Sequence, residues 1–169
     1  MLDYARETGG PALRDIGFAG RGKVLADLAG AIHAAREELL DLSMGCAGTT
    51  RGDAKFDLDG ATGTLAAYGH FAADLEGRGA FLPDGEGVAL GRTARFWGQH
   101  ILVPRRGVGV HINAFNFPAW NMAEKMACSL LAGVPVIEKP GTATAMLAWR
   151  VAEVIANSGV LPDGAFQFL

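Results

Sequence analysis

The sequence has few cysteines and no excess of positive charge. Cys46 and Cys128 are its two cysteines, and neither belongs to a C-x-x-C pair, so we expect no zinc site and no disulfide framework. The four histidines show no metal-ligand spacing either. The formal net charge of −3 gives no broad basic surface for a nucleic acid or an anionic membrane. A small molecule is therefore the expected ligand.

Long hydrophobic runs are also missing. No apolar stretch approaches the ~20 residues of a membrane span, and the first ten residues lack a basic region followed by an apolar one. Half of the 169 residues are nonetheless hydrophobic and a fifth are charged, which is typical of a folded chain. We expect a cytoplasmic protein with a substantial core, and with more apolar surface than it can bury alone.

Two helical patterns occupy residues 1–79, the expected amino-terminal helical segment. Apolar residues between Phe18 and Met44 alternate steps of three and four, which predicts one long amphipathic helix. A second pattern of the same kind covers residues 58–75. Asp57 or Asp59 precedes that pattern and is expected to cap the start of the second helix.

The residue pattern changes at residue 80. Residues 80–106 place turn residues around β-branched and aromatic ones, which predicts a β-hairpin. Residues 107–169 alternate strand and helix patterns in the order β-α-β-α-β, which predicts a parallel sheet, about half of a nucleotide-binding fold. The expected fold class is α/β: a partial Rossmann-like parallel sheet preceded by long amphipathic helices and a β-hairpin.

Ligands of open parallel sheets bind outside the carboxyl ends of the strands, so the residues after each strand are the candidates for chemistry. Asn116 follows the first strand, where its amide is either an oxyanion donor or the cap of the next helix. Lys139 ends the second strand, where it is either a donor to a cofactor or a solvated charge. The usual G-x-G-x-x-G fingerprint is missing, and Gly107 and Gly109 are expected to be structural.

Two linked motifs carry a resemblance to a known family. H-I-N-A-F-N-F-P-A-W-N followed by S-L-L-A-G-V-P-V-I-E-K-P resembles the aldehyde dehydrogenase pattern W-N-F-P, then A-L-A-A-G-N-x-V-V-x-K-P, at the same separation. The resemblance covers nearly the whole chain, because the family also begins with long helices and a hairpin used in oligomerisation. The stretch R-G-D-A-K-F-D-L-D-G-A-T-G-T-L is most similar to enzymes of phenylacetate and benzoate degradation that oxidise CoA-linked semialdehydes.

The resemblance implies a catalytic role for one residue after the first strand. Asn116 matches the family asparagine that, with the backbone N–H of the nucleophile, forms the oxyanion hole for the thiohemiacetal. Asn113, Ala114 and Phe115 match the segment that lines the cofactor pocket, and Phe115 replaces the commoner tryptophan.

The resemblance also implies how the cofactor binds after the second strand. Lys139 matches the lysine that binds the adenosine ribose. Thr142 falls where NAD-preferring members often carry a glutamate, so there is room for a 2′-phosphate and NADP is favoured over NAD. Glu138 stands where an apolar residue is usual, and strand alternation points it away from Lys139.

The family's glycine-rich turn, general-base glutamate and nucleophilic cysteine all lie downstream of the matched region, which reaches Leu169. Cys128 is expected to be a core residue on the apolar face of a helix. Two hypotheses stay open. Either the chain is the amino-terminal part of an enzyme that oxidises a small-molecule aldehyde and forms a homo-oligomer (dimer or tetramer) at full length, or it is a truncated, inactive cofactor-fold or interaction module. In both cases we expect the chain by itself to be inactive.

Overall fold

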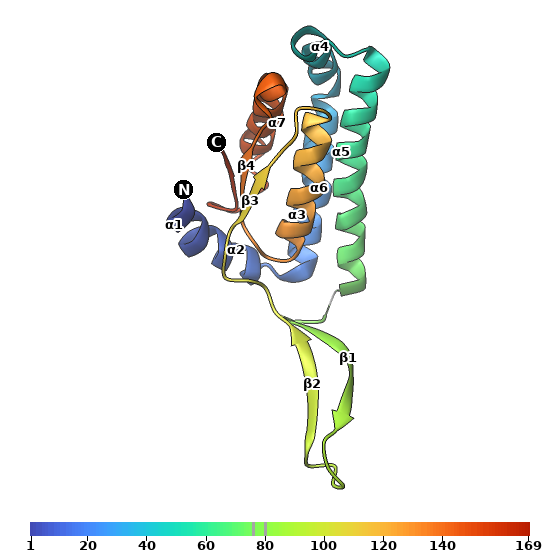
Figure 1. Cartoon of the computed structure of the whole chain (residues 1–169), viewed down its shortest axis with the longest axis vertical. Helices are drawn as coiled ribbons and strands as arrows, with labels where there is room; N and C mark the ends of the chain where they lie inside the picture. Colours follow the sequence, from blue (N-terminus) through green and yellow to red (C-terminus); the bar gives the residue numbers. More distant parts are fainter. Residues whose placement is uncertain (76, 80) are drawn as a thin grey trace.

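The structure, a computed structural model, describes residues 1–75, 77–79 and 81–169, and consists of a helical body from which a two-stranded hairpin projects (Figure 1). A parallel three-stranded sheet and an antiparallel pair confirm the predicted α/β class. Ala80, where the hairpin segment is expected to begin, lies outside the described residues. No helix in the described parts of the chain is long and apolar enough to cross a membrane.

Helices make up most of the first 75 residues. They are α1 (Leu2–Tyr4), the π-helical turn η1 (Ala5–Gly9), α2 (Gly10–Asp15), α3 (Gly17–Ala34), α4 (Arg36–Ala47), α5 (Arg51–Phe71) and the 3₁₀ turn η2 (Ala72–Leu75).

The single long helix expected between Phe18 and Met44 is wrong, because the structure contains two helices there. The chain bends at Ala35, where φ is −90° and ψ is 7°, and α4 begins at the next residue. The bend brings α4 against the carboxyl-terminal helix α7 (Ala145–Asn157). There Arg150 of α7 forms two hydrogen bonds, of 2.6 and 2.9 Å, with the Glu38 carboxylate of α4.

The expected cap of the second helix is also wrong. The helix α5 starts at Arg51, and its cap is the Thr50 side chain, which accepts a hydrogen bond of 3.1 Å from the backbone N–H of Asp53. Asp59 lies inside the helix and pairs with Arg36 at 2.9 Å. Asp57 is also inside the helix, and its carboxylate accepts hydrogen bonds from the backbone N–H groups of Ala119 and Trp120. A threonine followed three residues later by an acidic residue is a strong helix start, and it precedes the apolar pattern.

The parallel sheet follows the hairpin. Its strands are β3 (Gly109–Ile112), β4 (Val136–Lys139) and β5 (Phe166–Phe168), in the spatial order β3-β4-β5. The connections contain α6 (Pro118–Leu131), the 3₁₀ turn η3 (Thr142–Thr144) and α7. Ile112 pairs with Lys139, so β3 and β4 end level with each other. The segments that follow these two strands therefore leave the sheet side by side.

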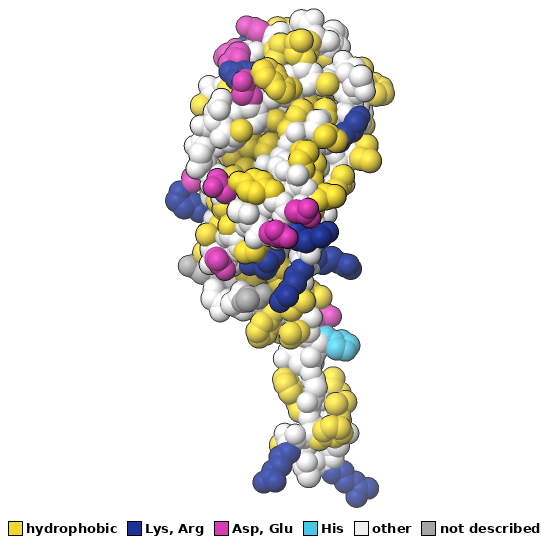
Figure 2. All heavy atoms as spheres, turned by 90° about the vertical axis from the view of Figure 1, so that its left-hand side faces the viewer, with side chains coloured by type: hydrophobic (Ala, Val, Ile, Leu, Met, Phe, Trp, Pro, Cys, Tyr) yellow, Lys and Arg dark blue, Asp and Glu magenta, His cyan; other side chains and the backbone are white. Residues whose placement is uncertain are grey.

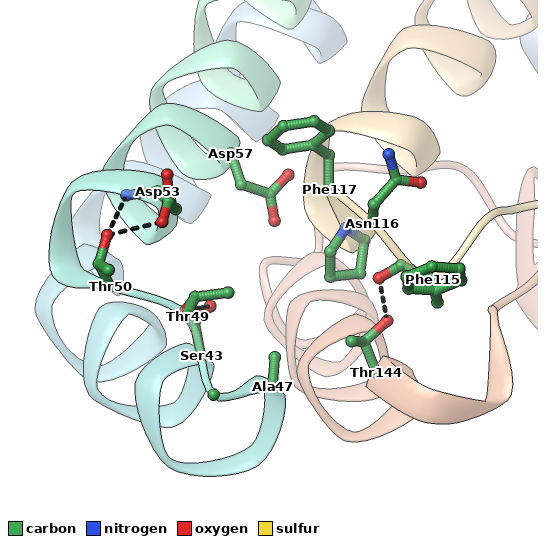
Figure 3. A pocket seen from close by; sticks show the side chains of 12 residues that line it. Ser43, Ala47, Thr49, Thr50, Asp53, Asp57, Phe115, Asn116, Phe117 and Thr144 are labelled. Carbon is green, nitrogen blue, oxygen red and sulfur yellow. Dashed lines mark hydrogen bonds between the residues drawn. The ribbon is translucent and has the colours of Figure 1, made fainter.

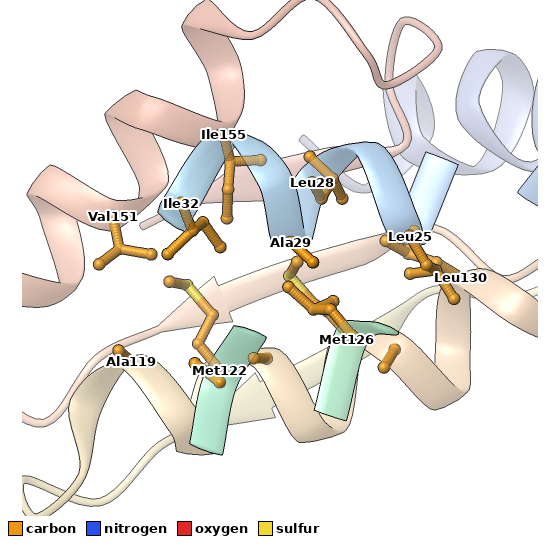
Figure 4. Packing of buried hydrophobic residues seen from close by; sticks show 14 of the residues in the cluster. Leu25, Leu28, Ala29, Ile32, Ala119, Met122, Met126, Leu130, Val151 and Ile155 are labelled. Carbon is orange, nitrogen blue, oxygen red and sulfur yellow. The ribbon is translucent and has the colours of Figure 1, made fainter. Parts of the chain in front are cut away.

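One hydrophobic cluster joins the first helices to the sheet half of the chain. It contains Leu25, Leu28 and Ile32 of α3, Met122 and Met126 of α6, and Val151 and Ile155 of α7 (Figure 4). Each of these residues is at most 1% exposed. Burial of a large aliphatic side chain contributes about 1.5–3 kcal/mol to folding, so this cluster holds α6 against α3 and α7.

The hairpin consists of β1 (Leu82–Ala89) and β2 (Trp97–Leu102), which pair antiparallel. Its second strand ends at Leu102, two residues before Pro104. Its large apolar side chains are exposed: Val88, Leu90, Phe96, Trp97, Ile101 and Leu102. Figure 2 shows such side chains along the projecting hairpin, away from the helical body.

Candidate active site

The two predicted candidate segments lie together at the carboxyl ends of β3 and β4. The backbone N–H of Asn113 donates to the carbonyl oxygen of Lys139 at 2.9 Å, and the Thr144 hydroxyl donates to the carbonyl oxygen of Phe115 at 2.6 Å. A Cβ on Gly141 would stand 2.6 Å from the backbone nitrogen of Phe115, so only glycine permits this approach of the two segments. The parallel sheet thus brings residues 113–116 and 139–142 together.

Asn116 lies in a turn that the backbone itself holds. The next residue, Phe117, is the N-cap of α6 and has φ 51° and ψ 56°, a left-handed conformation that is uncommon for any residue but glycine. The Asn121 amide donates to the carbonyl oxygens of Asn116 at 2.5 Å and of Phe117 at 3.0 Å. The interpretation of Asn116 as a helix cap is wrong, because Phe117 is the N-cap and α6 has no side-chain cap of its own.

The first amides of α6 bind a carboxylate from another helix. Asp57 of α5 accepts hydrogen bonds from the backbone N–H groups of Trp120 at 2.8 Å and Ala119 at 3.2 Å. Its side chain is buried, and burial raises the pKa of the Asp57 carboxyl above its ordinary value, while the two N–H groups oppose part of that rise. A carboxylate at this place is also attracted by the positive end of the helix dipole.

A cavity of about 390 Å³ separates this turn from the connection between α4 and α5. Figure 3 shows Thr49 and Thr50 on one side of it, across from Asn116 and Phe117. It is lined by Ser43, Ala47, Gly48, Thr49, Thr50, Asp53, Asp57, Phe115, Asn116, Phe117, Pro118 and Thr144. Asn116 also borders a second hollow of about 280 Å³, on the side of Trp120 and Glu124. Its side chain is exposed and stands between the two.

Aromatic rings surround the turn. Phe56 of α5 meets Phe117 and Trp120 edge to face, with ring centroids 5.7 and 5.3 Å apart. The indole N–H of Trp120 donates to the Thr64 hydroxyl at 2.9 Å. A Cβ on Gly60 would lie 2.4 Å from the Trp120 ring, so α5 and α6 are in close contact here. Nothing in the local sequence pattern distinguishes Phe56 from another exposed helix residue, so its place beside this turn was not predictable.

Lys139 and Thr142 provide hydrogen-bond donors at the end of β4. The half-buried Lys139 ammonium donates to the carbonyl oxygen of Pro140 at 2.7 Å, and the exposed Thr142 opens η3. An ammonium and a hydroxyl beside the carboxyl ends of parallel strands are the donors that ribose hydroxyls and phosphates require. These residues therefore fit a dinucleotide.

Asn113 belongs to a buried polar network. Its amide N–H donates at 2.8 Å to the carboxylate of Glu138, which is fully buried and also bonds Nδ1 of His111 at 2.7 Å. Nε2 of His111 lies 3.1 Å from the hydroxyl of Ser129 on α6. The Asn113 side chain is thus turned toward Glu138, while Ala114 and Phe115 are exposed. Its amide oxygen is buried and has no hydrogen-bond partner among the described residues.

A sequence model described as "Aldehyde dehydrogenase family" matches residues 1–169. The chain belongs to the aldehyde dehydrogenase family. Aldehyde dehydrogenases use a nicotinamide cofactor, act on small aldehydes and are typically oligomeric. The resemblance found in the sequence is thereby confirmed.

Alignments with named relatives include almost the whole of this aldehyde dehydrogenase chain. It is 46% identical over 168 residues to the 3,4-dehydroadipyl-CoA semialdehyde dehydrogenase of Aromatoleum evansii, an alignment with 99% of this chain and 32% of that protein. It is 28% identical over 158 residues to the D-glyceraldehyde dehydrogenase (NADP(+)) of Thermoplasma acidophilum, with 94% and 30% covered. An Escherichia coli NADP-dependent enzyme of known structure has the same fold, with a TM-score of 0.78, 22% identity, and 98% and 33% covered. The chain thus spans about a third of the length of these relatives.

The expected burial of Cys128 is wrong in this aldehyde dehydrogenase chain. The residue is exposed, and its thiol donates to the Tyr68 hydroxyl of α5 at 2.8 Å. Position 128 lies at the margin of the α5–α6 contact, and the apolar spacing of the helix did not reveal this. No group of three or more potential metal ligands is present in the described part of the chain.

Proposed function

We propose that the complete gene product containing this chain oxidises an aldehyde to the acid with a nicotinamide cofactor, and that the aldehyde is a CoA-linked semialdehyde of aromatic catabolism. The 46% identity to the Aromatoleum evansii semialdehyde dehydrogenase, over 168 residues, is the observation that carries this proposal. The alternative substrates are aldehydes without CoA, such as those named for the more distant relatives.

Asn116 is the proposed catalytic residue of this chain. When a thiolate attacks the aldehyde carbon, negative charge develops on the carbonyl oxygen, and the Asn116 amide would donate a hydrogen bond to that oxygen. Such a donor is worth about 3 kcal/mol of barrier when it is already oriented before the reaction. The exposed side chain of Asn116 and the hydrogen bonds from Asn121 to the backbone of this turn support the proposed role.

Lys139 and Thr142 are the proposed cofactor ligands, with Asn113, Ala114 and Phe115 lining the pocket. Lys139 would bind the adenosine ribose, and the short Thr142 leaves room for a 2′-phosphate, so NADP is favoured over NAD. Asn113 would contribute through its backbone, because its amide N–H is bound to Glu138. When bound, the nicotinamide supplies the acceptor for the hydride that leaves the substrate.

The hairpin is the proposed oligomerisation surface. We divide the chain into an amino-terminal helical segment (1–79), an oligomerisation hairpin (80–106) and the first half of the cofactor domain (107–169). Val88, Phe96 and Trp97 each expose more than half of their surface to solvent. Exposed apolar residues gathered on a projecting element are typical of a protein contact, here with a second copy of the chain in a dimer or tetramer.

The test is an assay of the purified complete gene product. Its rate of NADPH or NADH production with 3,4-dehydroadipyl-CoA semialdehyde is compared with the rate for the same carbon skeleton without CoA. A preference of the kcat/KM value for the CoA-linked aldehyde supports the proposal. Equal values for both substrates contradict the substrate class, and absence of oxidation with any aldehyde supports the inactive module instead.

A further inference from the structure

Asp57 supplies a cap to a helix that lacks one. The first N–H groups of a helix have no acceptor within the helix, and the side chain of the N-cap residue usually binds them. The N-cap of α6 is Phe117, whose ring has no acceptor. Asp57 accepts from Ala119 and Trp120 instead, although it is 62 residues upstream and inside another helix. It is 3% exposed, and its carboxylate accepts these two hydrogen bonds in the interior.

The two hydrogen bonds of Asp57 stabilise the strained residue Phe117, which follows Asn116. The left-handed conformation is unfavourable for a non-glycine residue such as Phe117, and it persists only where the surroundings impose it. Asp57 fixes the amides that follow Phe117, and Asn121 fixes the carbonyl oxygens on the other side. The backbone at Asn116 is therefore held from both directions.

The neighbouring residues of α5 reinforce this contact. Phe56 packs on the rings of Phe117 and Trp120, and Thr64 accepts from the indole N–H of Trp120. Phe56, Asp57 and Thr64 of α5 thus all contact the start of α6. Rotation of the α6 terminus would break the Asp57 bonds and the ring contacts together.

We infer that Asp57 is a positioning residue for Asn116: it fixes the first turn of α6 and the strained Phe117, and thereby the direction of the Asn116 amide. This inference rests on the proposed oxyanion role of Asn116. A displacement of about 1 Å at a catalytic group can cost a hundredfold in rate, so the turn does not have to unfold for turnover to suffer.

The variant Asp57→Asn tests the inference in the complete gene product. Asparagine has the same size but can accept only through its carbonyl oxygen, and its NH₂ group faces the other helix amide. We expect kcat to fall by about tenfold or more, while the KM for NADP stays within about twofold. The matched control is Asp59→Asn, which removes an exposed carboxylate on the same helix and should leave kcat unchanged. An unchanged kcat in Asp57→Asn overturns the inference.

A double-mutant cycle separates positioning from a general loss of structure. In the Asn116→Ala background, Asp57→Asn should change kcat by less than about twofold, because the group that it positions is already gone. A loss as large as that in the wild-type background overturns the inference. Normal turnover in Asn116→Ala alone would instead refute the proposed catalytic role of Asn116, on which this inference rests. If Asp57→Asn does not accumulate as folded protein, Asp57→Glu, which shifts the carboxylate by one methylene, should show the same fall in kcat, and a normal kcat there overturns the inference.

Discussion

Arg21 and Asp57 bind opposite ends of the same helix, α6. Arg21 donates to the carbonyl oxygen of Leu131 at 2.8 Å, and Asp57 accepts from the N–H of Trp120 at 2.8 Å. A cation at the carboxyl end and an anion at the amino end both interact favourably with the partial charges of the helix dipole. The helix that begins beside Asn116 is therefore fixed at both ends by the first helices of the chain.

Arg21 is buried and also donates to the carbonyl oxygen of Leu13 at 2.9 Å. Burial, and to a smaller extent Arg14, lowers the pKa of its guanidinium. Arg21→Met should lower the free energy of unfolding by about 2–4 kcal/mol, because two buried carbonyl groups lose their donor. Denaturant unfolding measures this loss. The exposed Arg6→Met is the control, and an equal effect of both would contradict the prediction.

Asn116→Ala should lower kcat by about a hundredfold or more, with nearly unchanged cofactor affinity, because the hydrogen bond strengthens in the transition state. Thermal stability should stay close to that of the wild type, since Asn116 does not cap α6. Steady-state kinetics and a melting curve on the same sample measure both quantities. Asn157→Ala, at the exposed end of α7, serves as the control. A lower melting temperature with normal turnover is the result that refutes a catalytic role.

Thr142→Glu should shift cofactor preference toward NAD, because a carboxylate would repel the 2′-phosphate of NADP. The measurement is the ratio of the kcat/KM values for NADP and NAD in the complete gene product. Thr142→Gln has the same size without the charge, so it should shift the ratio less. If neither variant moves the ratio, Thr142 does not lie beside the ribose.

The pair of Glu38 and Arg150 should make stability depend on pH in the acid range. The hydrogen bond with Arg150 lowers the pKa of the exposed Glu38 carboxyl below the ordinary 4.5, and partial desolvation opposes this shift. The stabilising contribution of Glu38 is therefore present above pH 4.5 and is lost as the pH falls through the lowered pKa. Glu38→Gln should melt below the wild type at neutral pH, and the two curves should converge in acid. A difference that is constant with pH contradicts the prediction, and Glu7→Gln is the control.

Val88→Glu should weaken self-association of the complete gene product. Val88 is 61% exposed on the hairpin, and a charge in an apolar contact raises the dissociation constant by about tenfold or more. Analytical ultracentrifugation over a range of concentrations measures the change. Ala66→Glu, on the exposed side of α5, introduces the same charge away from the hairpin and should have no effect. An unchanged sedimentation profile for Val88→Glu would remove the hairpin from the interface.

Much of the architecture was determined by the sequence itself. The alternation of strand and helix after residue 107 follows from local apolar patterns, and the parallel sheet follows from that order. Because parallel strands end at one edge, the meeting of residues 113–116 with residues 139–142 was predictable, and the contact of Gly141 with Phe115 confirms it. The roles of Asn116 and Lys139 remain predictions from the family resemblance.

Features that depend on contacts between residues far apart in the sequence were decided only by the tertiary structure. The bend at Ala35 could not be predicted from a run of good helix formers, because it depends on where α7 lies. Asp57 has the local sequence of a cap for its own helix, yet its partners are amides 62 and 63 residues away. Glu138 similarly takes the Asn113 amide that the motif alone would assign to a cofactor. A side chain's partner is the nearest group that satisfies its charge or hydrogen bonds after packing, and only the packed chain determines which group that is.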